Sequence, residues 1–385
     1  MAILGTLIEQ VRGVSYKPED LHTTLNENSV TLLRANNIKD GKLNFDDVVY
    51  VDKRKVSEKQ LLKSGDILIC ASSGSKELVG KAAYVAEDMA ITFGAFCKVV
   101  RPKTECPQYI GHFFNSPYYR ERIANAAAGA NINNIRNEHI DVLEIAWPSH
   151  EEQQDAVAVL DKVIELIAQR KEQLAKLDQL VKFRFIELFG DPVKNNMGWE
   201  SKPLNDVCDG IGDGLHGTPE YDEGGEYPFI NGNNLIDGEI IITPATKMVA
   251  AKTYEKHFID ISTNAILISI NGTLGKLAFY NGEKVMLGKS ACYCNLKQDI
   301  NKVFVYGVMK SDAFAEFLEN SSTKSTIKNV GLKAMREFRL ILPPMELQEQ
   351  FATFVEQTDK SKLAIQQSLD KLELLKKSLM QEYFG

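Results

Sequence analysis

Residues 177–190 read LDQLVKFRFIELFG, and residues 372–385 read LELLKKSLMQEYFG. At a constant offset of 195 residues the two stretches share six identical pairs, which are Leu177 and Leu372, Leu180 and Leu375, Lys182 and Lys377, Glu187 and Glu382, Phe189 and Phe384, and Gly190 and Gly385. This offset is close to half of the 385-residue chain. The sequence is therefore a tandem repeat whose period is half its length.

Each stretch lies at the end of a longer segment with helical spacing. Apolar residues recur mostly at intervals of three, four or seven and so fall on one helical stripe. The stripe of the first segment comprises Leu160, Ile164, Ile167, Leu174, Leu177, Val181, Phe185 and Leu188, and that of the second comprises Phe351, Val355, Ile365, Leu369, Leu372, Leu379 and Tyr383. Each predicted helix has about 40 residues and is roughly 60 Å long if unbroken.

Both stripes are narrow and flanked by charge, as at residues 169–172 and 360–362. A coiled coil between the two helices would bury both stripes, and we favour it over two separate surface helices that each lie on their own domain. Ser149 is the expected N-cap of the first helix, with Glu152 three residues later. Gly190 and Pro192 are expected to end it, because glycine suits the left-handed C-cap and proline cannot continue a helix.

The segments before the two helices also repeat. Short β-branched or aromatic runs predict strands at residues 30–33, 48–51, 65–70, 81–85 and 95–100, followed by a helix over 109–128 and a strand over 140–147. Residues 36–41 return as 233–238, Gly80 and Lys81 as Gly275 and Lys276, and Pro148 as Pro343. We therefore divide the chain into residues 1–149, 150–190, 191–343 and 344–385.

Composition and charge exclude several classes of protein. No run of 18 apolar residues and no secretion signal is visible, so a cytoplasmic location is expected. Six cysteines without a CxxC pair favour reduced, buried thiols over a zinc site. The net charge is −7, and residues 1–149 hold 18 basic and 18 acidic groups. Nucleic-acid binding would therefore depend on local clusters, with much of the phosphate neutralisation left to a partner.

Enzyme signatures are missing or distorted. Residues 282–290 place five residues between two glycines where a P-loop needs four, and Leu342-Pro-Pro-Met345 lacks the amide and the aromatic of a methyltransferase motif. No HExxH and no Gly-x-Ser-x-Gly occurs, and the six histidines are scattered. We expect no catalytic residues, no metal site and no cofactor bound by this chain.

Polar, amide-rich loops occupy equivalent places in the two copies. Asn side chains can donate and accept at an adenine edge, Arg and Lys reach guanine, and Ser, Thr and backbone N–H groups hold phosphates. The competing interpretation is ordinary turn chemistry, in which Asn, Gly and Ser are common. The candidate DNA-binding residues are Arg34, Asn36, Asn37, Ser73, Lys76, Lys81, Asn133, Asn134 and Arg136 in the first copy, and Asn231, Asn233, Asn234, Asn271, Lys276, Lys289, Lys328 and Asn329 in the second.

This combination resembles a known family. A helix that ends in FIELFGDP, followed by Gly198-Trp-Glu200, then a second variable domain and a helix that ends in YFG, is similar to the specificity subunit of type I restriction-modification systems. The resemblance covers the whole chain. It implies an α+β fold in which two tandem β-rich target recognition domains, 1–149 and 191–343, are joined by helical spacers, 150–190 and 344–385, that pack as an antiparallel, pseudo-two-fold symmetric coiled coil.

The resemblance also implies a function. Each recognition domain would read one half of a bipartite double-stranded DNA target in the major groove, while the helices set the spacing and dock two methyltransferase subunits. Those subunits would bind S-adenosylmethionine and methylate adenine, and restriction subunits that use ATP could join. The residues leave two alternatives open, which are a structural coiled-coil adaptor with two protein-binding modules and a fused enzyme.

Overall fold

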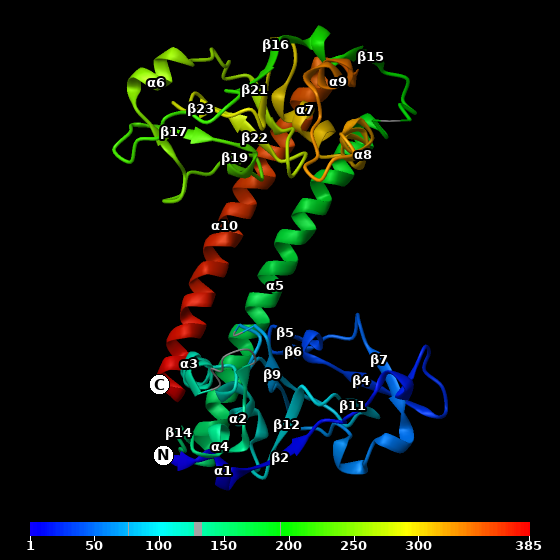
Figure 1. The fold of residues 1–385 in the computed structure, drawn as a ribbon, viewed down its shortest axis with the longest axis vertical. Coiled ribbons are helices and arrows are strands. Elements are labelled where there is room, and N and C mark those ends of the chain that lie inside the picture. Colours follow the sequence, from blue (N-terminus) through cyan, green and yellow to red (C-terminus); the bar gives the residue numbers. More distant parts are fainter. Residues whose placement is uncertain (76, 127–132, 193) are drawn as a thin grey trace. The chain divides into compact units, whose positions relative to one another are not determined.

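The computed structural model describes residues 1–75, 77–126, 133–192 and 194–385 (Figure 1). The chain forms two compact units: unit 1 comprises Met1–Glu172 with Gln366–Gly385, and unit 2 comprises Gln173–Ile365. Two long helices, α5 (His150–Phe189) and α10 (Met345–Phe384), have 40 residues each, which confirms the helices predicted from the apolar spacing. Each of them contributes one half to unit 1 and the other half to unit 2.

The ends of the long helices are fixed by local hydrogen bonds. The Ser149 N–H donates to Glu152 Oε2 at 2.9 Å and the Glu152 N–H to Ser149 Oγ at 3.3 Å, as expected for a capping box. Gly190, at φ +73°, ends α5 in the left-handed conformation. Gln153 and its counterpart 195 residues later, Gln348, each donate to the carbonyl five residues earlier, at 3.0 and 2.8 Å, so both helices begin in the same way.

In unit 1 the first half of α5 runs antiparallel to the last half of α10. Leu160 of α5 and Phe384 of α10 lie in the same core cluster, and further along α5 the Arg170 Nε donates to Ser368 Oγ at 3.2 Å. Phe384 also contacts the Tyr109 ring at a centroid distance of 5.0 Å, which ties the end of α10 to the β-rich part of this unit. The core of unit 1 is therefore built from residues that are up to 380 positions apart, between Leu4 and Phe384.

Unit 2 repeats this packing with the opposite halves of the same helices. Phe189 of α5 and Phe351 of α10 are buried against each other with ring centroids 5.6 Å apart, and Lys362 pairs with Asp178 at 2.7 Å. Residue numbers rise along α5 as they fall along α10, so the two half-helices of this unit are also antiparallel. Phe189 and Phe384 are equivalent in the repeat, and they occupy equivalent places in the cores of unit 2 and unit 1.

The β-rich part of unit 1 contains two four-stranded sheets. One has the order β10-β8-β12-β2 with antiparallel neighbours, and the other has the order β11-β4-β7-β3, in which β11 runs parallel to β4. The elements of this part are β1 (Ala2–Ile3), α1 (Leu4–Leu7), β2 (Ile8–Arg12), β3 (Leu21–His22), β4 (Ser29–Leu33), β5 (Ile38–Lys39), β6 (Lys42–Leu43), β7 (Val49–Asp52), β8 (Ile67–Cys70), β9 (Ser72–Ser73), β10 (Ala82–Tyr84), β11 (Ile91–Phe93), β12 (Cys97–Pro102), α2 (Pro107–Phe113), α3 (Pro117–Ala126), β13 (Asn133–Asn134), α4 (Asn137–Asp141) and β14 (Glu144–Ile145).

Unit 2 has a similar topology, but its second sheet has three strands where that of unit 1 has four. One sheet has the order β16-β24-β21-β22, and the other has the order β20-β17-β23, in which β23 runs parallel to β17. The elements of this part are β15 (Glu200–Pro203), β16 (Cys208–Asp213), β17 (Tyr227–Ile230), β18 (Leu235–Ile236), β19 (Glu239–Ile240), β20 (Met248–Val249), α6 (Ala251–Lys256), β21 (Ala265–Ser269), β22 (Leu277–Tyr280), β23 (Met286–Leu287), β24 (Ala291–Leu296), α7 (Lys302–Met309), α8 (Asp312–Ser321), α9 (Leu332–Glu337) and β25 (Arg339–Leu342).

The strands at the centre of each unit explain why this topology is stable. β8 and β21 are buried along their whole length, so their unbroken apolar runs face layers on both sides. The predicted strands over residues 30–33, 48–51, 65–70 and 81–85 correspond to β4, β7, β8 and β10. The predicted internal repeat is therefore present in the topology as well as in the sequence, and the fold is α+β with two duplicated β-rich parts.

Two local predictions were wrong. The helix expected over residues 109–128 is two helices, α2 and α3, because Pro117 cannot continue α2 and Ser116 caps the new helix by accepting from the Tyr119 N–H at 3.2 Å. Residues 127 and 128 lie outside the described ranges. The strand expected over 140–147 is only β14, because α4 extends to Asp141.

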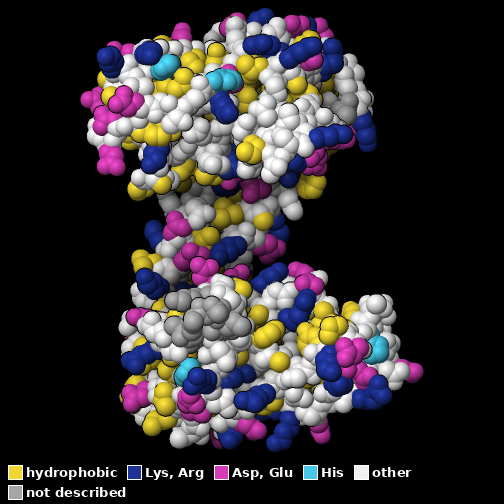
Figure 2. All heavy atoms as spheres, viewed as in Figure 1, with side chains coloured by type: hydrophobic (Ala, Val, Ile, Leu, Met, Phe, Trp, Pro, Cys, Tyr) yellow, Lys and Arg dark blue, Asp and Glu magenta, His cyan; other side chains and the backbone are white. Residues whose placement is uncertain are grey.

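All six cysteines are free and buried, as predicted. In the part of the chain that the structure describes, no cluster of His, Cys, Asp and Glu has the arrangement of a metal site. No helix formed by those residues combines the length and the apolar character that spanning a membrane requires. On the face drawn in Figure 2, Lys and Arg side chains alternate with Asp and Glu over each unit, in keeping with a net charge of −7.

Candidate nucleic-acid interface

In unit 1 the fold brings two of the predicted loops together. The two residues of β9 pair antiparallel with those of β13, so that Ser73 lies opposite Asn133 and Ser72 opposite Asn134. The Ile135 N–H then donates to the Ala71 carbonyl at 2.8 Å. These loops are separated by about 60 residues in the sequence, and the predicted contact residues Ser73, Asn133 and Asn134 end up on one ribbon.

Unit 2 forms the equivalent ribbon with a single bridge. Asn271 pairs with Asn329 across the bridge, and the Asn271 Nδ2 donates to Asn329 Oδ1 at 3.1 Å. The Val330 N–H donates to the Ile270 carbonyl at 2.9 Å, as Ile135 does to Ala71 in unit 1. The side chains of Asn271 and Asn329 thus use part of their hydrogen-bonding capacity on each other and retain the rest for another partner.

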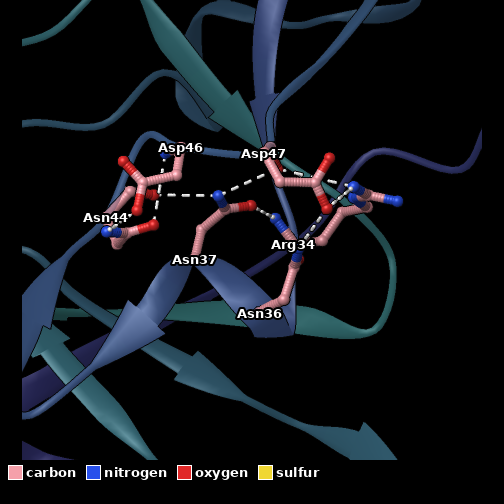
Figure 3. A network of polar contacts seen from close by, with 6 residues as sticks. All are labelled: Arg34, Asn36, Asn37, Asn44, Asp46 and Asp47. Carbon is pink, nitrogen blue, oxygen red and sulfur yellow. Dashed lines mark hydrogen bonds and ion pairs between the residues drawn. The ribbon is translucent and has the colours of Figure 1, made fainter. Parts of the chain in front are cut away.

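A second cluster in unit 1 surrounds Asp47 (Figure 3). The Arg34 Nη2 and the Asn36 Nδ2 both donate to Asp47 Oδ2, at 2.9 and 2.7 Å. The Arg34 Nε is buried and has no hydrogen-bond partner among the described residues. Nearby, the Asn44 amide and the Lys39 ammonium hold the pKa of the Asp46 carboxyl below its usual value. The cluster therefore presents exposed amide and guanidinium donors beside two carboxylates.

The structure corrects the prediction for Asn37. Its side chain is 0% exposed, accepts from the Arg34 N–H at 2.8 Å and donates to the Asn44 and Asp47 carbonyls at 2.8 and 3.0 Å (Figure 3). Asn37 therefore holds the loop together and cannot reach a base. Asn234 makes the matching bonds in unit 2, since it accepts from the Asn231 N–H at 2.9 Å and donates to the Ile241 carbonyl at 2.9 Å, but its side chain is only half-buried. We therefore remove Asn37 alone from the candidate contacts.

The turn between two strands connects the two clusters of each unit. In unit 1 the Gly94 N–H donates to the Leu33 carbonyl at 2.9 Å, next to Arg34, and the Phe96 carbonyl accepts from the Ser72 N–H at 3.0 Å. In unit 2 the Gly288 N–H donates to the Ile230 carbonyl at 2.9 Å. The Ser290 carbonyl accepts there from the Ile270 N–H at 3.0 Å. In each unit, the loops predicted to contact DNA thus lie along one continuous edge.

Other candidates on this edge differ in how occupied their side chains are. Lys81, Lys276 and Lys289 make no side-chain hydrogen bond or ion pair with another described residue, and Asn233 is exposed. Lys328 pairs with Glu319 at 2.6 Å, and Arg136 with Glu138 at 3.3 Å. The Asn231 Oδ1 accepts from Ser290 Oγ at 3.1 Å. Lys76 lies outside the described residues, and the Asn133 side chain is likewise not described.

The edge consists mainly of hydrogen-bond donors and amide groups, and a groove lies beside it in unit 2. The groove beside it in unit 2 runs between residues 272–275, α8 and residues 326–328 and is open to solvent. Charged and amide donors at the ends of loops, beside an open groove, are suited to a long polar ligand such as the edges and phosphates of a DNA groove.

A duplicated fold with one donor-rich edge in each copy is suited to a protein that reads two stretches of DNA sequence. The comparison with known families agrees. The family described as "Type I restriction modification DNA specificity domain" matches residues 22–179 and 196–374, and this chain belongs to it.

Individual relatives carry related names. The chain is 29% identical over 412 residues to the type I restriction enzyme StySPI specificity subunit of Salmonella potsdam, with 100% of this chain and 88% of that protein covered. It is 38% identical over 183 residues to the EcoKI specificity subunit of Escherichia coli strain K12, covering 47% of this chain and 39% of that one.

Two solved structures share the fold. The S subunit of the type I restriction-modification system from M. genitalium aligns over 100% of this chain and 95% of its own, with a TM-score of 0.58 and 15% identity. A chain from a structure on assembly and conformational transition of the type I system covers 100% of this chain and 96% of its own, with a TM-score of 0.60 and 18% identity.

Proposed function

We propose that this chain is the sequence-reading subunit of a type I restriction-modification complex, in which units 1 and 2 each read one half of a bipartite target in the major groove. The observation that carries this proposal is the repeated edge. The same backbone bonds hold β9 against β13 in unit 1 and residue 271 against residue 329 in unit 2, whereas the side chains along the two edges differ. A shared backbone framework that carries different side chains in the two units suits the recognition of two different half-sites.

The partners follow from the same proposal. Two methyltransferase subunits would bind S-adenosylmethionine, methylate adenine and supply most of the phosphate neutralisation that a chain of net charge −7 lacks. The restriction subunits would be a further, ATP-using addition. This chain would itself be non-catalytic and would hold no cofactor, and the cytoplasm, where chromosomal DNA is accessible, fits this role.

The long helices are the proposed docking surfaces for the methyltransferase subunits. Phe183 and Ile186 of α5 are 66% and 56% exposed, and Leu374 of α10 is 66% exposed. Large apolar side chains on an otherwise charged helix lose little by contacting another protein and gain the free energy of burial. This supports a protein partner on the helices and DNA on the loop edges.

Lys81 and Lys276 provide a matched test, because they are equivalent in the repeat and both lie on the edge without an internal partner. The chain would be co-expressed with the methyltransferase of its own host, and modified adenines would be mapped across the genome. We expect one bipartite motif that depends on the chain. Lys81→Ala should reduce methylation through one half-site and Lys276→Ala through the other, roughly ten-fold each at limiting enzyme if one phosphate or base contact is lost.

Two outcomes would contradict the proposal. Methylation that is independent of the chain would remove the DNA-recognition role, and complex formation without a chain-dependent motif would favour the structural adaptor instead.

A further inference from the structure

The most exposed aromatic side chain of unit 1 lies on the candidate edge and has no role in the proposals above. Phe96 is 69% exposed and belongs to the turn that joins β11 to β12. The amino-acid sequence predicts a strand from residue 95 onwards, and an alternating strand would have given this phenyl ring a neighbour on one face of a sheet. In the structure β12 begins only at Cys97, so Phe96 points from a turn instead.

The turn is rigid. The Cys97 N–H donates to the Gly94 carbonyl at 2.8 Å, and the Phe96 carbonyl accepts from both Ala71 and Ser72, at 2.9 and 3.0 Å. A Cβ at Gly13 would clash with the Gly94 carbonyl oxygen, so the two backbones are in close contact on the other side of the turn. The backbone that carries the phenyl ring is therefore held on both sides of the turn.

The turn also lies between the two polar clusters of unit 1. Gly94 is bonded to Leu33, which precedes Arg34, while Phe96 is bonded to Ser72 of the β9–β13 ribbon. A large apolar side chain thus stands in the middle of an edge of amides, hydroxyls and cations. Exposing a phenyl group to water has a cost that any polar residue at this position would avoid.

Unit 2 shows that the frame does not require an aromatic residue. Gly288 and Ser290 make the backbone bonds that Gly94 and Phe96 make in unit 1. The side chains there are polar: Lys289 is exposed, and the Ser290 Oγ accepts from the Gly232 N–H at 3.0 Å. The phenyl group is therefore a property of unit 1 and not of the fold.

In the DNA major groove, the apolar feature that distinguishes one base from the others is the 5-methyl group of thymine, and a phenyl ring is one of the side chains that contact it. We propose that Phe96 is a specificity-determining residue that packs against a thymine methyl group in the half-site read by unit 1. This inference rests on the proposed function. It assigns a thymine contact to the centre of the unit 1 edge, where unit 2 offers the ammonium of Lys289 to guanine or phosphate.

The test uses the complete complex with its methyltransferase subunits and a duplex carrying the mapped target. Each thymine of both half-sites is replaced in turn by deoxyuridine, which removes only the methyl group, and binding is measured for the wild type and for Phe96→Ala. For the wild type, one replacement should weaken binding roughly four-fold, the effect of one buried methyl group. The Phe96→Ala protein should bind the thymine duplex at least four-fold more weakly than the wild type does. It should bind the thymine and uracil duplexes with the same affinity.

Phe258→Ala provides the matched control, because Phe258 is 58% exposed but lies after α6, in edge-to-face contact with Tyr254, and should behave as the wild type. Wild-type affinity of Phe96→Ala, equal sensitivity of both proteins to every deoxyuridine, or loss of methyltransferase binding instead of DNA discrimination would each overturn the inference. Each of these results could be obtained while the complex still methylates a motif that depends on this chain, so the proposed function would stand. If no such motif exists, the proposed function itself fails.

Discussion

Asn36 and Asn37 are neighbours in the sequence and differ in almost every physical respect. The Asn36 side chain is exposed and makes one hydrogen bond, to the Asp47 carboxylate. The Asn37 side chain is fully buried and satisfies one backbone N–H and two backbone carbonyls of the loop. The first can exchange its partner for a base edge, whereas the second could do so only if the loop opened.

We predict that Asn37→Ala lowers the free energy of unfolding of unit 1 by about 2–3 kcal/mol, because it leaves buried backbone groups without partners. Asn36→Ala should change it by less than about 0.5 kcal/mol, as expected for an exposed residue. Hydrogen exchange of the unit 1 strands, followed by mass spectrometry, measures both effects locally. If Asn37→Ala retained native protection and yet lost sequence discrimination, Asn37 would be a direct base contact.

At the residue scale, the sequence identified the polar loops but could not distinguish their exposed residues from their buried ones. Asn and Ser at residues 36–37, 72–73 and 133–134 predict polar loops, and β9 and β13 bring two of these loops together. Nothing local distinguishes Asn37 from Asn36, since the partners of Asn37 come from residues 44 and 47 after a hairpin. Phe96 was missed because the strand predicted to begin at residue 95 begins two residues later.

At the scale of the elements, each unit buries one half of α5 and one half of α10 in its core. The end of α5 brings Phe189 into the core of unit 2, and the end of α10 brings the equivalent Phe384 into the core of unit 1. Periodicity predicted both helices because an apolar stripe of this length, repeating at helical spacing, is compatible with few structures other than a helix. It missed the break between α2 and α3, although Pro117 was a visible signal.

We therefore predict that Phe189→Ala destabilises unit 2 and that Phe384→Ala destabilises unit 1, each by about 3–5 kcal/mol, the usual effect of truncating a buried phenylalanine. Phe183 lies on the same helix as Phe189 but is 66% exposed, so Phe183→Ala should leave both units as stable as the wild type. Chemical denaturation with hydrogen exchange resolved by unit measures these effects. Equal destabilisation of both units by either core variant would contradict the assignment of helix halves.

At the scale of the whole molecule, the sequence repeat predicted two copies of one fold, and the two units do share a four-stranded sheet and a parallel strand pair, although the second sheet of unit 2 has one strand fewer. The DNA target could not be predicted, because it depends on which loop atoms remain unpaired after folding. We propose that α5 and α10, which each contribute to both units, set the distance between the two half-sites.

Lengthening both helices tests this claim most directly. Seven residues would be inserted after Gln169 in α5 and seven after Ser368 in α10, since these positions adjoin the hydrogen bond between Arg170 and Ser368. Two helical turns add about 10.5 Å, or about three base pairs of DNA. The same insertion between Glu223 and Gly224, in an exposed loop of unit 2, is the control and should leave the target unaltered. Genome-wide mapping of methylated adenines should show both half-sites unchanged and the gap between them longer by about three base pairs. An active complex with an unchanged gap would show that the helices do not set the spacing.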